Sequence, residues 1–313
     1  MFAAERATAD KQRLEIFKGI LNVSRLVFGK HLEQLLTLIQ INTYPTDPSN
    51  PDACARMLNK AFDTSKKHQH QHMTRELLES ISAYKSWSST DDSSVLVLAG
   101  ETNTNARAGR GYTHSWLSPA TLFAVDTLRE KGAIVVYYCC HPGVRTDDND
   151  LDIDLAKDML TKLAYQLLES QPKVLRRKMA QLQSIVSKPI WSILDTKKNE
   201  NYKCESYELR ERQRAALSSW FSLLREILKE LREEGFTYLV IDRLDLVEVR
   251  VSYFMDELVA LVRNEGCAVK VMAVVDTVRG EWDEDLNVTD KRVLIVQGLD
   301  QKPAGTFGLT FRG

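Results

Sequence analysis

Apolar residues recur along the chain in two alternating patterns: short runs typical of buried strands, and longer stretches with the spacing of amphipathic helices. The short runs predict five strands, at residues 95–99, 133–140, 237–242, 268–275 and 292–297. The longer stretches predict helices at residues 118–131, 154–170, 206–234 and 251–265. Strands that alternate with helices predict an α/β fold, in which a parallel sheet of five strands is covered by helices on both faces.

The first 87 residues have a different pattern, with helical spacing and no strand signal. A long helix is predicted over residues 5–41 by its apolar positions, which are Leu14, Phe17, Leu21, Phe28, Leu32, Leu35, Leu36 and Ile39. A break rich in Pro, Ser and Asn follows at 43–51, and two further helices are predicted near 52–64 and 73–85. This part of the chain is therefore expected to be helical.

A polar run at residues 88–94, Ser-Ser-Thr-Asp-Asp-Ser-Ser, separates this helical part from the first predicted strand and is typical of a linker. Later in the chain, Ser118 followed by Pro119 predicts the start of a helix, with Ser118 as its N-cap. The expected organisation is an N-terminal helical region (1–87), a main α/β domain (93–298) and a C-terminal tail (299–313).

Composition and charge narrow the class of protein. The chain has 313 residues, and its 42 Lys and Arg against 43 Asp and Glu give a net charge of −1. A near-neutral balance gives no field that attracts nucleic acid or an anionic membrane, so neither partner is expected. The N-terminus lacks the pattern of a signal peptide, and no apolar run has the length of a membrane span. Five cysteines, an odd number without a Cys-x-x-Cys pair, are typical of free thiols in a reducing compartment, which predicts a cytoplasmic protein.

Candidate chemistry begins where the strand Thr-Tyr-Leu-Val-Ile-Asp runs directly into Asp242. A carboxylate at the carboxyl end of a buried parallel strand is placed to hold Mg²⁺ beside a phosphate, directly or through water. Asp245 follows three residues later, where it can polarise an attacking water. The alternative is a buried strand that simply ends in a polar turn.

Two further segments stand in the order that a nucleotide site needs. The strand at 95–99 ends in Gly100, where a phosphate loop begins, and the strand at 268–275 is followed by Asp-Thr-Val and then Arg279. Together with the runs Ser-Trp-Leu-Ser-Pro at 115–119 and Tyr-Tyr-Cys-Cys-His at 137–141, they resemble STAND-type P-loop NTPases. The resemblance is to a degenerate branch of the NACHT-like domains of filamentous fungi, and it covers residues 93–298.

The resemblance implies a strand order and a ligand site. Its implied spatial order, with all strands parallel, is 292–297, 94–100, 269–275, 237–242 and 133–140. It also implies ATP or ADP with Mg²⁺ at the carboxyl end of the sheet, and Asp242 as the metal ligand. Arg279 would sense the γ-phosphate, so Asp242 and Arg279 are expected at the same end, close to the loop after Gly100.

The phosphate loop departs from the family pattern. A working loop reads Gly-x-x-x-x-Gly-Lys-[Ser/Thr], and its lysine reaches the β- and γ-phosphates. Residues 101–113 contain no lysine, and Glu101 brings a negative charge. One alternative is a loop that has lost phosphate. The other is a rebuilt anion loop, with Arg107 or Arg110 in place of the lysine. The residues of such a loop would be Gly100, Arg107, Gly109, Arg110, Gly111 and Thr113.

The second departure is that the sequence runs only 16 residues past its last predicted strand, where family members continue into a helical lid and a winged helix. A complete switch ATPase is therefore not expected. The expected function is a nucleotide-binding or vestigial nucleotide-binding regulatory module with protein partners and little or no ATP hydrolysis. Two alternatives stay open: a ligand-free scaffold that binds partners through its N-terminal helices, and an active NTPase with an arginine-bearing phosphate loop.

Three other clusters have simpler explanations. The stretch His-Gln-His-Gln-His at 68–72 lacks a cysteine or acidic partner at ligand spacing, and polar histidine tracts are common on surfaces. The acidic run at 147–154 lacks the glycine and glutamate that a calcium loop requires, and the dipole of the following helix explains it. Cys140 and His141 are neighbours on a strand and point to opposite faces, so a thiol–imidazole pair is not expected.

Overall fold

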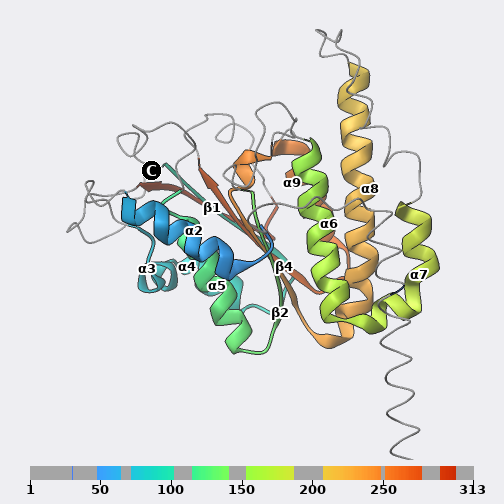
Figure 1. Ribbon diagram of the computed structural model, residues 1–313, viewed down its shortest axis with the longest axis horizontal. Coiled ribbons are helices and arrows are strands. Elements are labelled where there is room, and N and C mark those ends of the chain that lie inside the picture. The colour runs from blue at the N-terminus through green and yellow to red at the C-terminus, as the bar shows by residue number, and fades with distance from the viewer. Residues whose placement is uncertain are drawn as a thin grey trace, which may run out of the picture.

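A five-stranded sheet lies at the centre of the molecule, with helices on both of its faces (Figure 1). The computed structural model describes Lys30 and residues 48–64, 72–101, 115–140, 153–186, 207–247, 251–276 and 290–300. The strands are β1 (Ser94–Glu101), β2 (Ile134–Cys139), β3 (Thr237–Asp242), β4 (Val269–Asp276) and β5 (Val293–Asp300). All neighbouring pairs are parallel, in the order β2-β3-β4-β1-β5. Both the parallel sheet and the predicted order of its strands are confirmed.

The helices form two layers. One face of the sheet is covered by α2 (Pro51–Thr64), α3 (Arg75–Ser80), α4 (Ser82–Ser89) and α5 (Ser118–Glu130) (Figure 1). The other face is covered by α6 (Ile153–Ser170), α8 (Tyr207–Leu231) and α9 (Val251–Arg263), and α7 (Pro172–Val186) packs against α8. Two short 3-10 turns follow α8 and β3, and they are η5 (Arg232–Glu234) and η6 (Leu244–Leu246). The long helix predicted over residues 5–41 lies outside the described residues, apart from Lys30.

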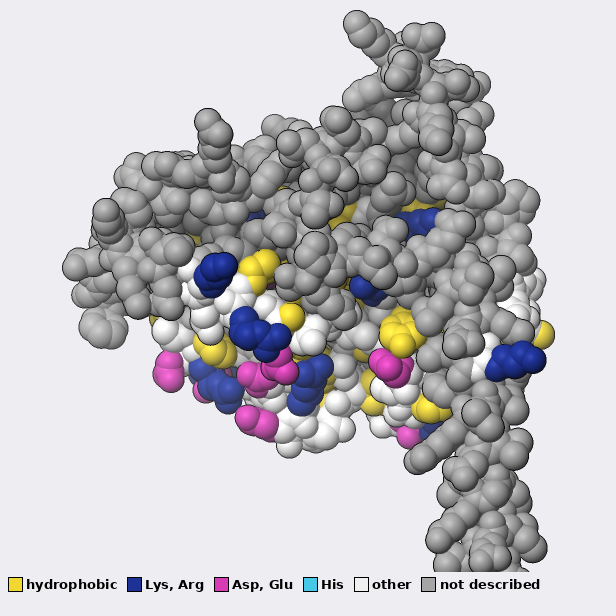
Figure 2. Space-filling model, in the orientation of Figure 1, with side chains coloured by type: hydrophobic (Ala, Val, Ile, Leu, Met, Phe, Trp, Pro, Cys, Tyr) yellow, Lys and Arg dark blue, Asp and Glu magenta, His cyan; other side chains and the backbone are white. Residues whose placement is uncertain are grey.

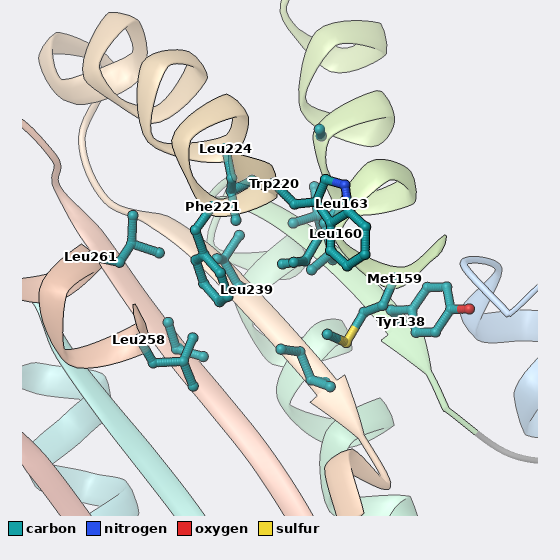
Figure 3. Close-up of a cluster of buried hydrophobic side chains, with 14 of the residues drawn as sticks. Tyr138, Met159, Leu160, Leu163, Trp220, Phe221, Leu224, Leu239, Leu258 and Leu261 are labelled. Atoms are coloured by element: carbon teal, nitrogen blue, oxygen red, sulfur yellow. The ribbon is translucent and has the colours of Figure 1, made fainter. Parts of the chain in front are cut away.

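The larger apolar core lies between the sheet and the layer of α6, α8 and α9 (Figure 3). Trp220 and Phe221 of α8 are at most 1% exposed, and they pack over Leu239 of β3 and the leucines of α6. Phe221 meets Phe254 of α9 edge to face, with 5.2 Å between the ring centroids. Because each such side chain contributes about 1.5–3 kcal/mol when buried, this layer carries much of the stability.

The opposite face has its own core, in which Trp87 of α4 is fully buried and meets the Tyr238 ring edge to face at 5.7 Å. The single helix predicted at 73–85 is wrong. The chain forms α3 and α4 instead, because Ile81 adopts an extended conformation (φ −69°, ψ 116°) and buries its side chain between them. The helices α3 and α4 share one core with the sheet, and the predicted division of the chain at 88–94 stays a prediction.

The backbone groups on the outer edge of β2 are hydrogen-bonded to a side chain of α6 and to the chain that precedes α2. The Gln166 amide donates to the Tyr137 carbonyl oxygen (2.8 Å), and Gln166 Oε1 accepts from the Tyr137 N–H (3.1 Å). Two residues further on, the Cys139 N–H donates to the Pro48 carbonyl oxygen (2.9 Å). These contacts satisfy backbone groups that an edge strand would otherwise offer to another strand.

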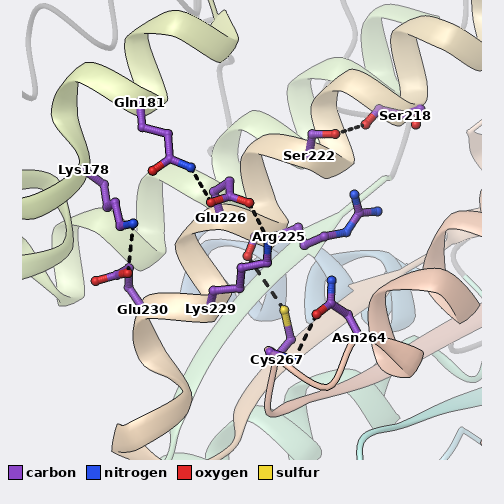
Figure 4. Close-up of polar contacts among 11 residues, drawn as sticks. Lys178, Gln181, Ser218, Ser222, Arg225, Glu226, Lys229, Glu230, Asn264 and Cys267 are labelled. Atoms are coloured by element: carbon purple, nitrogen blue, oxygen red, sulfur yellow. Dashed lines mark hydrogen bonds and ion pairs between the residues drawn. The ribbon is translucent and has the colours of Figure 1, made fainter.

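Polar contacts follow the outer side of α8 (Figure 4). Lys178 of α7 lies 3.3 Å from Glu230, and Gln181 donates to Glu226 of α8. On the face drawn in Figure 2, the described basic and acidic side chains are interspersed rather than gathered by sign. Among the described helices, none is both long enough and apolar enough to cross a membrane.

Candidate functional site

Because all five strands are parallel, their carboxyl ends meet at one edge of the sheet, where open α/β sheets bind ligands. At this edge Gly100 of β1 is in register with Asp276 of β4, and Cys139 of β2 is in register with Asp242 of β3. Asp242 and Gly100 therefore lie at the same end, as expected. Arg279, the loop after Glu101 and its predicted phosphate ligands Arg107, Gly109, Arg110, Gly111 and Thr113 lie outside the described residues.

Asp242 is almost completely buried, with 1% of its surface exposed. Its Oδ2 accepts a hydrogen bond from Cys139 Sγ (3.5 Å), whereas Oδ1 has no hydrogen-bond partner among the described residues. Burial raises the pKa of Asp242 to about 6, and the Arg243 charge, Ser118 and Cys139 oppose this rise. The fold thus keeps a carboxylate where its ionised form is poorly solvated, which is typical of functional sites.

The start of α5 lies next to Asp242. The prediction that Ser118 caps this helix is wrong, because Leu117 is the cap residue and no side chain caps the helix. The Ser118 hydroxyl lies near Asp242 and lowers its pKa, without the geometry of a hydrogen bond. In a working phosphate loop, a serine or threonine at the start of the helix follows the lysine. The residue before Ser118 is Leu117, which is fully buried.

Gly100 has a packing role that explains the absence of a side chain. The ladder of β1 continues through Glu101, one residue beyond Gly100, and its register with β5 shifts between Leu98 and Gly100. A Cβ on Gly100 would lie 2.2 Å from the Leu299 carbonyl oxygen and 3.0 Å from Leu117 Cδ1. Glycine therefore lets β5 and the start of α5 approach β1 closely. A phosphate-binding role for Gly100 stays a prediction.

Asp245, the predicted catalytic residue, is part of a buried ion pair. Arg243 Nε lies 3.0 and 3.2 Å from its two oxygens, and Arg243 Nη2 lies 2.8 Å from Oδ2. Asp245 Oδ1 also accepts from the Asp276 N–H at 3.1 Å. Both oxygens are thus engaged, and polarising a water would require Arg243 to move. The role of Asp245 in catalysis stays a prediction that faces this obstacle.

Arg243 was missed by sequence reasoning, although it stands between the two aspartates that drew attention. It has a left-handed backbone conformation (φ 58°, ψ 48°) and is 5% exposed. Burial alone lowers the pKa of Arg243, but the charges of Asp245, Asp276 and Asp242 outweigh it and raise this pKa. The sequence signal that could have identified Arg243 is its place between Asp242 and Asp245, where a cation can pair with a carboxylate.

The residues of this edge do not fit Mg²⁺ as they are arranged. Mg²⁺ takes oxygen ligands in octahedral geometry and keeps several waters. The oxygens of Asp242 and Ser118 are buried, ionisation of Asp242 is disfavoured, and Asp245 is paired with Arg243. Within the described ranges, no three His, Cys, Asp or Glu residues are grouped as metal ligands.

The other polar residues near this edge have structural roles. Tyr138 donates to Asp158 Oδ2 of α6 (2.6 Å), and this pair joins β2 to the helical layer. Cys140 is buried on the same side and lies 3.7 Å from Met159 Sδ. Burial raises the pKa of the Cys140 thiol, so it has the properties of an inert core thiol.

No model of a known protein family matches the chain, and no curated protein matches it either. The class of the protein therefore rests on its architecture, an α/β fold with five parallel strands flanked by helices. What the carboxyl edge of the sheet does has to be argued from its own chemistry.

Proposed function

We propose that this chain is a vestigial nucleotide-binding module with a regulatory or protein-interaction role, and that it hydrolyses little or no ATP. The observation that carries the proposal is the buried carboxylate of Asp242 at the carboxyl edge, whose Oδ1 has no hydrogen-bond partner among the described residues. The proposal extends the resemblance to degenerate STAND-type NTPases of the NACHT-like kind.

The position of Asp242 supports an ancestral ligand site. Stability alone does not favour a buried carboxylate that has one oxygen without a partner among the described residues. The carboxylate lies at the carboxyl end of a central strand and beside the start of a helix, where α/β proteins bind phosphates. Ser118 at this helix start has the residue type that accompanies Mg²⁺ in a phosphate loop.

The same edge argues against turnover. Phosphoryl transfer requires positive charge aimed at the γ-phosphate. In the described part of the edge, the guanidinium of Arg243 is paired with Asp245 and is not aimed at a ligand. An active NTPase would have to use Arg107 or Arg110, which lie outside the described residues.

A ligand-free scaffold is the second candidate function, and one observation favours it. Gly100 and the Arg243–Asp245 pair are both explained by packing and charge compensation, without a ligand. On this account the chain keeps the fold for its surface and binds protein partners, with no role for nucleotide.

A thermal-shift titration with ATP, ADP and GTP in the presence of Mg²⁺, combined with a phosphate-release assay, tests the proposal. We expect at most a small rise in melting temperature at 1 mM nucleotide, and phosphate release near background. The Asp242→Ala variant should lose any Mg²⁺-dependent part of the rise and leave phosphate release unchanged. A rise that vanishes in Asp242→Ala favours the vestigial site, and no rise in either protein favours the scaffold.

The proposal fails if binding is tight or turnover is robust. Nucleotide at about 100 times its dissociation constant stabilises a protein by ~2.7 kcal/mol, which is a shift of several degrees. A shift of that size, or phosphate release that disappears in Asp242→Ala, would identify a working NTPase.

A further inference from the structure

The two outer strands of the sheet are protected to different degrees. At the β2 edge, Gln166 and the Pro48 carbonyl oxygen engage backbone groups of the strand. At the other edge, β5 pairs with β1, and no described strand lies on its outer side. We propose that β5 is an interaction surface for a second copy of this chain, with the two β5 strands paired antiparallel about a twofold axis. This inference goes beyond the proposed function and does not rest on it.

The ladder between β1 and β5 determines which backbone groups of β5 face outward. The Val95 N–H donates to the Arg292 carbonyl oxygen (2.8 Å). Val97 is in register with Ile295. Because alternate residues of a parallel strand bond to the same neighbour, Leu294 turns its backbone groups toward β1. The N–H and carbonyl groups of Ile295 therefore point to the outer side, where an edge strand offers them to another chain.

The side chains of β5 suit a strand partner. Residues 293–299 include no charged residue and no proline, which are features by which proteins protect their edge strands. Leu294 and Ile295 are only partly buried, and they pack against the cores on opposite faces of the sheet. A further strand would cover both side chains, and apolar cross-strand pairs stabilise antiparallel strands.

The two ends of β5 carry opposite charge. Lys291 is exposed two residues before β5 begins, and Asp300 is the last residue of the strand. The neighbours of Lys291 in the sequence, Asp290 and Arg292, both bond to the end of α9. Lys291 is therefore the charge at this end of β5 that remains for a partner.

This charge pattern identifies a second copy as the occupant. In an antiparallel pair centred on Ile295, the outward backbone groups of this residue in the two copies bond to each other. The same pair sets Leu294 opposite Val296 of the second copy. It also brings Lys291 of each copy toward Asp300 of the other, and the twofold axis repeats this contact at both ends. A parallel pair would instead place like charges together, so β5 is complementary to itself in the antiparallel direction.

Sedimentation velocity of the full chain without nucleotide tests the inference. Wild type should pass from monomer to dimer between about 5 and 300 µM, because a single strand pair is a small interface and binds weakly. Lys291→Glu should raise the dissociation constant roughly tenfold, since an attraction that the axis repeats becomes a repulsion. The charge exchange Lys291→Glu/Asp300→Lys should restore the affinity of wild type.

Two further variants make the result specific to β5. Lys60→Glu makes the same charge change at an exposed position of α2, which lies beside the opposite edge of the sheet, and should leave dimerisation unchanged. Ile295→Lys places two like charges at the axis and should abolish the dimer. If Ile295→Lys fails to fold, the charge variants still decide the question.

The inference is overturned if wild type stays monomeric at the highest concentration, because β5 then has no second copy as its partner. It is also overturned if the charge exchange dimerises no better than Lys291→Glu, or if Lys60→Glu weakens the dimer as much as Lys291→Glu does. Nucleotide is absent from this experiment, so its outcome and that of the nucleotide titration are distinguishable.

Discussion

The two ends of the sheet each bury a charged side chain, and they satisfy it to different degrees. At the amino end, Lys270 of β4 is 1% exposed and donates to the carbonyl oxygens of Trp87 (2.7 Å) and Thr90. Its ammonium also lies 4.9 Å from the centroid of the Phe236 ring. At the carboxyl end, Asp242 is equally buried, yet one of its oxygens has no hydrogen-bond partner among the described residues.

This comparison distinguishes a buried charge with a structural role, Lys270, from a buried charge without one, Asp242. Lys270 holds the end of α4 on the sheet, and its donors and the nearby ring account for the buried ammonium without reference to a ligand. Burial shifts both pKa values against the charged form, lowering that of Lys270 and raising that of Asp242. Asp242 has only the weak Cys139 thiol donor on Oδ2, and its Oδ1 has no hydrogen-bond partner among the described residues. A buried charge that the surrounding structure does not satisfy is the better candidate for function.

The largest loss in the free energy of unfolding is expected when the buried ion pair at the carboxyl end is broken. Asp245→Ala removes the carboxylate that Arg243 Nε and Nη2 contact, and breaking a buried pair in this way costs about 3–5 kcal/mol. Urea unfolding followed by circular dichroism measures the loss. A loss below about 1 kcal/mol would mean that the pair is not the interaction that stabilises this edge.

A smaller loss is expected at the amino end. Lys270→Met keeps an unbranched apolar chain but leaves the carbonyl oxygens of Trp87 and Thr90 without their donor, at a cost of about 1–3 kcal/mol. The same urea experiment applies, with Lys229→Met on the exposed side of α8 as the matched control. If Lys270→Met were as stable as wild type, the Lys270 charge would have no structural role. The contrast between Lys270 and Asp242 would then be wrong.

The smallest effect is expected at the surface, which sets the scale for both ends. The Lys178–Glu230 pair between α7 and α8 is partly exposed, and solvent screens its attraction (Figure 4). Lys178→Ala should change the free energy of unfolding by less than about 1 kcal/mol. A loss as large as that of Asp245→Ala would show that burial does not explain the difference between these pairs.

Much of the fold was predictable because its signals are local and strong. The apolar runs around Val97, Val240 and Val271 are long enough to identify central strands, and the family resemblance supplied their order. The break at Ile81 was not predictable, because its apolar side chain fits a helical pattern as well as a buried bend between two helices. Tertiary packing decided between them.

The candidate site was predicted in part. Asp242 was identified because a strand runs directly into it, and the sheet brings it to the edge where Gly100 lies. The role of Arg243 was not predictable, since a left-handed arginine contradicts local preference and is held by contacts with Asp245. The proximity of Ser118 to Asp242 also depends on how α5 packs, which the sequence pattern does not specify.

The central claim is that Asp242 is kept at a cost to stability, and its pH dependence tests this most directly. Burial raises the pKa of Asp242 from 3.8 to about 6, so between these values the folded state binds more protons than the unfolded state. The free energy of unfolding should therefore fall as pH rises from about 4 to 6, and the penalty of about 3 kcal/mol should persist above pH 6.

The measurement is the difference in free energy of unfolding between Asp242→Asn and wild type, from urea titrations at pH 4 to 8. The neutral amide avoids the cost of burying a charge. Asp242→Asn should therefore be more stable than wild type by about 3 kcal/mol at pH 8, with the gain disappearing near pH 4. A variant that is less stable than wild type at every pH would show that the carboxylate is part of the structural framework, and it would contradict the account.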